Sequence, residues 1–316
     1  MLILTCVVLY IHMIEYHQDD EREQFMKVFT VINQKGGTGK TTLSLFLAQY
    51  YGQARKERVL CIDLDPQCNF SNLFLDMELG SLEDISPRPF IPPIHPDFEE
   101  GDDQWDGRSS SADIWLKGEA YEYPTRFDNI SIIPGHSQDL KLIEERHDLK
   151  SQIKETCRDF ISNPEMKLSE DFDIVIIDTS PELKPVTLSG LHAATHILIP
   201  TEMTELGTQG LAGMLAHYNS ENNERSALNE DPVKLVGVLA NKFKKQGSGH
   251  ASFYKAIRES DELGGYLMDN FLPQYSAYEN ATRTNAASIF ASKPSALARK
   301  ALERVCVEII ERMEAK

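Results

Sequence analysis

The feature that most constrains the fold is a strand-like run that stops at a glycine-rich turn and is followed at once by a helix-forming segment. Residues 28–33 are mostly apolar and mostly β-branched or aromatic, residues 34–39 read Gln-Lys-Gly-Gly-Thr-Gly, and residues 43–48 favour a helix. A strand, a tight loop and a helix in this order are typical of an α/β domain built on a parallel sheet.

The loop has the composition of a phosphate-binding site. Gly36, Gly37 and Gly39 allow positive φ and close backbone approach, so successive N–H groups can face an anion. The N-terminus of the following helix adds free N–H groups and the positive end of its dipole. Lys40 can reach the β- and γ-phosphates of a nucleoside triphosphate, and the Thr41 hydroxyl can ligate Mg²⁺.

The loop also departs from the usual P-loop pattern. That pattern has a glycine where this chain has Gln34, and a second lysine, Lys35, follows it. The alternative is a plain glycine-rich turn with two solvated lysines. Gly or Lys occupies five of the eight positions in 35–42 and a strand precedes them, so the pattern favours the nucleotide site.

Charge and cysteine content restrict the possible partners and the cellular compartment. The net charge is −17 at pH 7, so any contact with nucleic acid has to come from a local basic patch. The five cysteines are odd in number, contain no C-x-x-C pair, and include Cys61 inside an apolar run. They indicate a reducing compartment and argue against a disulfide framework, a structural zinc or an iron–sulfur cluster.

The N-terminal residues differ from the rest of the chain. Residues 1–14 are apolar, lack a basic flank and are too short to span a bilayer, and residues 15–24 are polar and acidic. We expect residues 1–25 to be an appendage, with an upstream start codon as one explanation, and residues 26–316 to form the domain. An interfacial membrane anchor made of residues 1–14 is the alternative.

Carboxylates end two runs that are predicted to be buried strands. Asp63 and Asp65 follow the run 58–62, and Asp178 ends the run 174–177. Ligands bind at the carboxyl edge of open α/β sheets, where these side chains would lie. Asp63 and Asp65 could instead cap a turn before Pro66. Asp178, considered together with Lys40 and Thr41, predicts the second element of a magnesium site.

Residues 76–128 form an acidic segment with fourteen Asp or Glu against four Arg or Lys, and prolines recur between 87 and 96. We expect a partly mobile, solvated excursion from the core, with partner binding as the alternative. Six strands are predicted elsewhere, near 28–33, 59–63, 129–133, 174–178, 195–200 and 234–240, and one helix over about 138–160. The predicted fold is a single α/β domain, a mainly parallel twisted sheet with helices on both faces.

Four segments carry a resemblance to a known family. They are Lys-Gly-Gly-Thr-Gly-Lys-Thr-Thr (35–42), Ile-Asp-Leu-Asp-Pro-Gln (62–67), Ile-Ile-Pro-Gly (132–135) and Ile-Ile-Asp-Thr (176–179). In this order they make the chain, from about residue 26 onward, resemble the ParA/MinD family of deviant P-loop ATPases. The resemblance is strongest to ParA-type DNA-partition ATPases.

The resemblance implies a role for each matched residue. Lys35 would cross a nucleotide-sandwiched dimer interface to the facing subunit's phosphates, and Asp65 would orient the attacking water. Thr41 would bind magnesium with Asp178 nearby, and Asp63 would support that site without touching the ion. The nucleotide would contact the loop residues Lys35, Gly36, Gly37, Thr38, Gly39, Lys40, Thr41 and Thr42, with Asn241 at the adenine edge and Pro273 against the base.

Two departures from the family pattern matter. Thr179-Ser180-Pro181 replaces Thr-Pro-Pro, and the helix-turn-helix domain of the larger partition ATPases is not present, so direct operator binding is not expected. The segment 302–316 has its apolar residues at helical spacing and mixed charges on its other face. We expect this segment to pack on the domain. MinD-like members of the family differ, because their C-terminal helix binds a membrane.

The function that the resemblance implies is an ATP- and Mg²⁺-dependent switch. A homodimer with ATP sandwiched between its subunits would bind DNA non-specifically, and a ParB-like centromere-binding protein or cargo adaptor would stimulate hydrolysis. The cargo would be plasmid or chromosomal DNA, in a cytoplasmic, nucleoid-associated protein. Candidate DNA contacts are Lys242, Lys244, Lys245, Arg283, Lys293, Arg299 and Lys300. A relative that positions a protein cargo over the nucleoid and a membrane-associated MinD-like regulator are the alternatives.

Overall fold

The computed structural model describes residues 26–80, 88–101, 105–244, 249–290 and 296–315; the predicted appendage, residues 1–25, lies outside them. Seven strands form one sheet in the order β5-β6-β2-β7-β1-β8-β9, and every neighbouring pair is parallel except β5 with β6. The strands are β1 (Lys27–Val31), β2 (Val59–Asp63), β5 (Tyr123–Pro124), β6 (Ile130–Ile133), β7 (Ile174–Asp178), β8 (His196–Glu202) and β9 (Lys234–Asn241). The predicted mainly parallel α/β sheet is confirmed.

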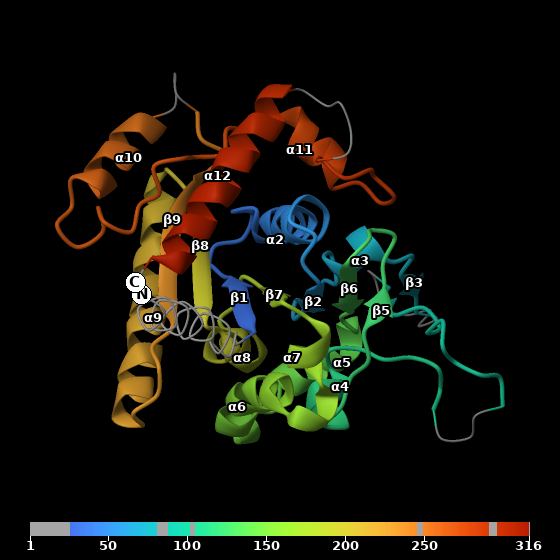
Figure 1. Ribbon diagram of the computed structural model, residues 1–316. Coiled ribbons are helices and arrows are strands. Elements are labelled where there is room, and N and C mark those ends of the chain that lie inside the picture. Colours follow the sequence, from blue (N-terminus) through green and yellow to red (C-terminus); the bar gives the residue numbers. More distant parts are fainter. Residues whose placement is uncertain (1–25, 81–87, 102–104, 245–248, 291–295, 316) are drawn as a thin grey trace, which may run out of the picture.

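Helices cover both faces of this sheet, with α2 and α12 above it and α6 and α8 below it in Figure 1. The central strands are buried along their whole length, and alternate residues point to opposite faces. Val59 and Cys61 therefore pack with α2 and α12, whereas Leu60 and Ile62 pack with the helices of the other face. The helices are α2 (Lys40–Gln49), α3 (Ser71–Phe74), α4 (Asp113–Leu116), α5 (Ser137–Glu144), α6 (Lys150–Ser162), α7 (Leu168–Asp171), α8 (Pro185–Ala193), α9 (Glu205–Ala227), α10 (His250–Arg258), α11 (Ser276–Ala281) and α12 (Ala296–Glu314).

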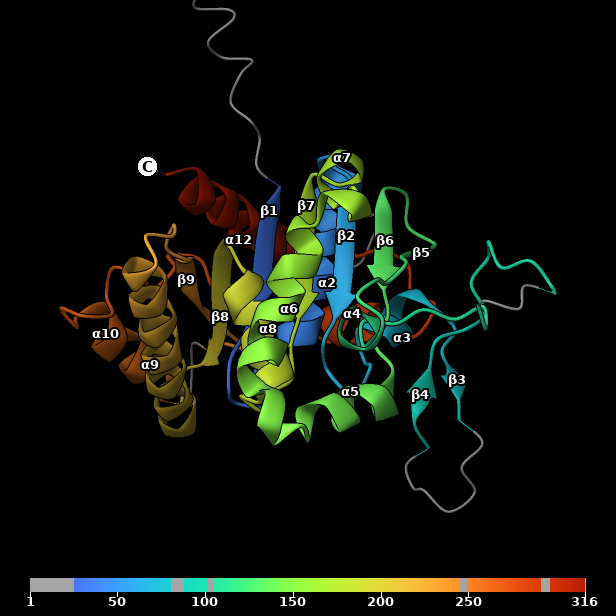
Figure 2. The same cartoon turned by 90° about the horizontal axis from the view of Figure 1, so that it is seen from below.

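The sheet register brings the predicted site residues to one edge. Val31 pairs with Asp178 on β7, and Asp178 pairs with Asp63 on β2. The three strands therefore end at the same level, and the loops that follow β1, β2 and β7 leave the sheet side by side. Figure 2 shows the three strands next to one another with α2 behind them.

The prediction of a single helix over about 138–160 is wrong. The structure has α5, a 3₁₀ turn (His147–Leu149) and then α6, with Arg146 in a non-helical conformation between them. Both helices contact α8, but α5 also contacts the short strand β4 (Phe90–Ile91), whereas α6 also contacts α4. Tertiary packing overrides a sequence with good helix propensity at this turn.

The prediction that residues 76–128 are largely solvated is also wrong for their second half. Beyond a short hairpin of β3 (Glu78–Leu79) with β4, this segment adds α4 and the antiparallel edge strand β5 to the domain. Ala112, Ile114 and Tyr123 are almost completely buried. Ala112 and Ile114 join the hydrophobic cluster on one face of the sheet, and Tyr123 joins the cluster on the other face, so composition alone suggested a looser segment than the one that forms.

The C-terminal helix packs on the domain, as expected. α12 buries Leu302, Val305, Ile309 and Met313 in the same hydrophobic cluster as α2. None of the described helices combines the length and the apolar character needed to cross a membrane. The four described cysteines, Cys61, Cys68, Cys157 and Cys306, are buried free thiols.

Candidate functional site

The glycine-rich loop 34–39 lies between the end of β1 and the start of α2 and is held from the side by the end of β9. Gly37 and Gly39 have φ of 79° and 87°, the left-handed region that favours glycine. The Asn241 side-chain amide donates to the Thr38 carbonyl at 2.7 Å, and Lys242 Nζ donates to the Gly37 carbonyl. The Lys35 amide donates to Asn33 Oδ1 at 3.1 Å, whereas the amides of residues 36–39 have no acceptor among the described residues and are available to a ligand.

Gly39→Ala is expected to lower the free energy of unfolding of the nucleotide-free protein by about 2 kcal/mol. A Cβ at this position would lie 2.4 Å from Asn241 Nδ2, and the left-handed backbone is strained for alanine. Gly36→Ala is the matched control, because a Cβ there meets nothing within 4 Å. Chemical denaturation of both variants measures the difference, and equal loss of stability would contradict this geometry.

Lys40 supplies a buried positive charge at the floor of the loop. The residue is 6% exposed, and its ammonium group makes no hydrogen bond or ion pair with any described residue. Burial lowers the pKa of Lys40, and the nearby carboxylates of Asp178 and Asp65 only partly offset this effect. An unpaired buried ammonium is costly, so the site fits an anion that would neutralise it.

Asp178 holds the hydroxyl groups at the start of α2. Its two carboxylate oxygens accept hydrogen bonds from Thr41 Oγ1 at 2.7 Å and Ser44 Oγ at 2.8 Å. Within the described parts of the chain, no three His, Cys, Asp or Glu side chains converge to hold a metal by themselves. Thr41 and Asp178 fit a magnesium ion that takes its remaining ligands from phosphate oxygens and water, as this ion usually does at nucleotide sites.

Asp63 fixes the loop that carries Asp65. Its carboxylate accepts from the amide of Asp65 at 3.0 Å and from both the amide and hydroxyl of Ser71, at 2.8 and 2.6 Å. These contacts position the segment from Asp65 to Ser71, and the predicted support of a metal by Asp63 stays a prediction. Burial raises the pKa of Asp63, and the adjacent Asp178 carboxylate adds to the effect.

Asp65 faces the loop from the end of β2. It is 7% exposed, and one carboxylate oxygen accepts from the Gln67 amide at 2.9 Å. Burial raises the pKa of Asp65, while the Gln67 amide and the charge of Lys40 act in the opposite direction. The second carboxylate oxygen has no donor among the described residues, so it is available to a water molecule in the cavity in front of it.

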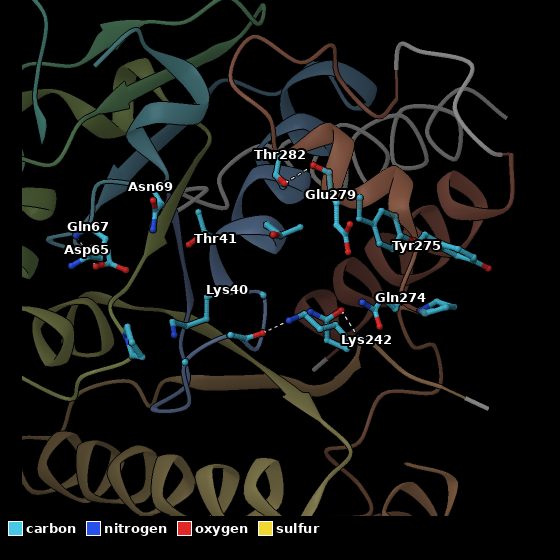
Figure 3. A pocket seen from close by; sticks show the side chains of 18 residues that line it. Lys40, Thr41, Asp65, Gln67, Asn69, Lys242, Gln274, Tyr275, Glu279 and Thr282 are labelled. Atoms are coloured by element: carbon cyan, nitrogen blue, oxygen red, sulfur yellow. Dashed lines mark hydrogen bonds between the residues drawn. The ribbon is translucent and has the colours of Figure 1, made fainter. Parts of the chain in front are cut away.

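A cavity of about 520 Å³ joins these groups (Figure 3). Lys40 and Thr41 lie at its centre, Asp65 and Asn69 on one side, and Glu279 on the opposite side. Asn241 and Pro273, predicted from the family resemblance, also line it. Reasoning from the sequence assigned no nucleotide contact to the rest of the lining, although Gln67 and Pro181 lie in segments that it singled out and Lys242 was a candidate DNA contact. These residues are Gln67, Asn69, Pro181, Lys242, Gln274, Tyr275, Tyr278, Glu279 and Thr282.

Lys35 lies exposed beside the first turns of α9. Gly210 and Gly213 of this helix approach the loop so closely that a Cβ on Gly213 would lie 2.1 Å from Gln34 Nε2, and one on Gly210 would lie 3.1 Å from Lys35 Cβ. The Lys35 ammonium has no ion-pair partner among the described residues. The Lys35 ammonium is therefore available to a group outside this subunit.

The candidate DNA contacts fall in two regions. Lys242 pairs with Glu202 at 3.2 Å, in addition to its contact with the loop, and Lys244 follows it at the end of β9. Arg283 is exposed after α11, Arg299 pairs with Glu303 at 2.8 Å, and Lys300 lies beside carboxylates on α12. Lys245 and Lys293 lie outside the described residues. All of these contacts stay predictions, and Lys242 is better placed to support the loop.

The chain is similar in sequence to a known family and to several known proteins. A family model described as an AAA domain matches residues 26–230. A chromosome-partitioning ATPase, Soj, of Thermus thermophilus is 28% identical over 66% of this chain and 66% of its own length. The chromosome partitioning protein ParA of Myxococcus xanthus is 26% identical over 69% of this chain and 65% of its own length.

A solved structure shares the fold along almost the whole chain. The ATP complex of a McdA variant from Cyanothece superposes with a TM-score of 0.67 and 20% identity, covering 92% of this chain and 97% of that chain. The chain spans between 39% and 66% of the length of the first three curated relatives that it matches.

Proposed function

The chain belongs to the ParA/MinD family of P-loop ATPases, and on that premise we propose that it is a magnesium-dependent ATPase that acts as an ATP-controlled dimer. The observation that carries this proposal is the convergence at one cavity of an unpaired buried Lys40, the Thr41–Asp178 pair and the Asp65 carboxylate. Together they offer a phosphate contact, a metal contact and a group for the attacking water.

Each side chain has a role in this proposal. The free amides of the loop and Lys40 bind the β- and γ-phosphates, and Thr41 with Asp178 would hold magnesium, which neutralises phosphate charge when it is bound. Asp65 orients the attacking water through its available oxygen. Lys40 and the loop amides then stabilise the negative charge that develops on the transferred phosphoryl group.

Lys35 is the residue on which the proposed dimer depends. Its exposed ammonium and its position at the mouth of the loop suit a contact with the γ-phosphate in a facing subunit. Two subunits that sandwich two ATP molecules would each complete the site of the other, as expected for an isologous dimer. ATP then controls association, and hydrolysis releases it.

The cellular role that we propose is the segregation of plasmid or chromosomal DNA. The ATP-bound dimer binds DNA non-specifically through the basic residues near the end of β9 or on α11 and α12, and a ParB-like partner on the cargo stimulates hydrolysis. This places the protein in the cytoplasm, on the nucleoid. The names of two relatives, a chromosome-partitioning ATPase and a chromosome partitioning protein, support this role over transport of a protein cargo.

DNA binding is expected only with ATP, and it should fall steeply as the salt concentration rises. Co-sedimentation with non-specific duplex DNA is measured with ATP, with ADP and without nucleotide, for the wild type and Lys35→Ala. The variant should bind ATP but fail to retain DNA, because its sandwich dimer is incomplete. DNA binding that is equal with ATP, with ADP and without nucleotide would contradict the proposed switch, and so would DNA binding that persists in Lys35→Ala.

A further inference from the structure

An apolar groove lies between α4, α5 and the start of α6, on the sheet face that carries α6 and α8. Its volume is about 320 Å³. Trp115 and Leu116 of α4 line it, together with Leu142 of α5 and with Leu149 and Ile153 at the start of α6. Leu116 and Leu142 are each 58% exposed, although both are large and apolar. The described parts of the chain therefore leave this groove open to water.

The lining of the groove selects an uncharged apolar occupant. Single exposed leucines are ordinary on a protein surface, but here two of them border a hollow that also contains an indole ring. Arg146 is the one charged side chain in the lining, and it is already paired with Asp148 at 3.1 Å. An apolar segment would gain from burial in this groove, whereas a charged one would find no counter-ion there.

The chain itself contains a segment of this chemistry. Residues 1–14, which lie outside the described residues, read MLILTCVVLYIHMI and contain no Asp, Glu, Lys or Arg. Residues 15–24 differ sharply, with five acidic residues against one arginine. The acidic run does not suit the groove and is long enough to act as a tether. The apolar run, left in water, would expose a continuous apolar stretch at a cost in free energy.

The described chain begins on the same face as the groove. Met26 packs against the hydrophobic cluster that Trp115 and Leu149 also join. In Figure 2, α7 lies near the starts of β1 and β7, and α6 extends from there towards α5. The thirteen residues of α6 span about 20 Å. Residues 15–25, when extended, reach about 36 Å, so residues 1–14 can reach the groove.

We propose that residues 1–14 dock in this groove of their own subunit, tethered by residues 15–25. A short tether keeps the segment at an effective concentration on the order of millimolar, which favours the groove of the same chain over that of a second copy. The acidic tether is repelled by an anionic lipid surface, which favours the groove over a membrane. The proposal does not depend on the proposed ATPase function.

Disulfide cross-linking of the full chain tests the docking. Cys6 lies within the segment, whereas the four described cysteines are buried. Gln152→Cys places a thiol on the exposed rim of the groove, and oxidised glutathione should join it to Cys6 within one molecule. Ser220→Cys is the matched control, since it is exposed on α9, which leads into β9, two strands from β1. Its cross-link should form about tenfold more slowly.

Two charges in the segment should abolish the difference between these cross-links. Leu4→Asp with Val8→Asp, combined with Gln152→Cys, should lower the cross-linking rate to that of the control, because an unpaired carboxylate is costly to bury in an apolar groove. Both substitutions precede residue 26, so the described domain keeps its own sequence there. Equal rates for Gln152→Cys and Ser220→Cys would overturn the proposal. A disulfide formed only between two molecules would overturn it in favour of a second copy.

The emission of Trp115 gives a second readout, from inside the groove. The chain has two tryptophans, Trp105 and Trp115, so Trp105→Phe leaves Trp115 as the probe. Adding Leu4→Asp and Val8→Asp should shift the emission to longer wavelength, since water then replaces the segment beside the indole. Phosphatidylglycerol vesicles added to Trp105→Phe alone should leave its emission unchanged. The absence of a shift in the charged variant, or a shift of the same size caused by vesicles, would overturn docking in the groove.

Discussion

Lys40→Ala is expected to weaken ATP binding by roughly 100-fold and to reduce hydrolysis to background. The ammonium of Lys40 is buried and has no partner in the described chain, so the triphosphate would be its counter-ion. Isothermal titration with ATP and a phosphate-release assay measure the two effects. Lys141→Ala, which removes an exposed lysine, is the matched control.

The stability of the nucleotide-free Lys40 variant gives a second and more specific readout. An unpaired buried charge destabilises the folded state, so its removal should not lower the free energy of unfolding by as much as a usual core truncation does. ATP should raise the melting temperature of the wild type but not that of Lys40→Ala. ATP binding of wild-type strength in the variant would exclude Lys40 as the phosphate contact.

Asp65→Asn is expected to reduce the rate of ATP hydrolysis by about 10²- to 10⁴-fold while ATP affinity changes little. The asparagine keeps an oxygen that can accept from the Gln67 amide, so the loop geometry is retained and only the negative charge is lost. Asp148→Asn, an exposed carboxylate on another turn, controls for the change in net charge. Single-turnover hydrolysis separates the chemical step from product release.

Asp65→Asn is also expected to differ from the wild type in DNA binding. If Asp65 acts only on the attacking water, Asp65→Asn should form the ATP-bound dimer and hold it longer than the wild type. Retention of DNA should therefore persist after ATP addition. Loss of ATP binding in Asp65→Asn would mean that this residue has a structural role, with Asp63 and Ser71, rather than a role in hydrolysis.

The centre of the fold could be predicted because its signals are local. Residues 28–42 contain the strand, the glycines that need positive φ, and the first helical turn, and Asp63 and Asp178 end runs long enough to be recognised as buried strands. A parallel sheet then brings these strand ends to one edge. The cluster of Lys40, Thr41, Asp65 and Asp178 follows from that rule.

The parts that were missed depend on contacts between distant segments. The break at Arg146 has no glycine or proline to mark it and is set by what α5 and α6 each pack against. Tyr123 becomes a core residue only because β5 pairs with β6. The hydrogen bond from Asn241 to Thr38 joins residues 203 positions apart, so no local pattern could have predicted it.

The most direct test of the shared site mixes two inactive variants. Lys35→Ala keeps Asp65 in its own site, and Asp65→Asn keeps the Lys35 that would serve the facing subunit. Each variant alone should be inactive, and an equimolar mixture should recover ATPase activity. Random pairing of the subunits sets an upper limit of about a quarter of the wild-type rate, since half of the dimers would be mixed and each would hold one complete site. A mixture that stays as inactive as its components would contradict the claim that a second subunit completes the site.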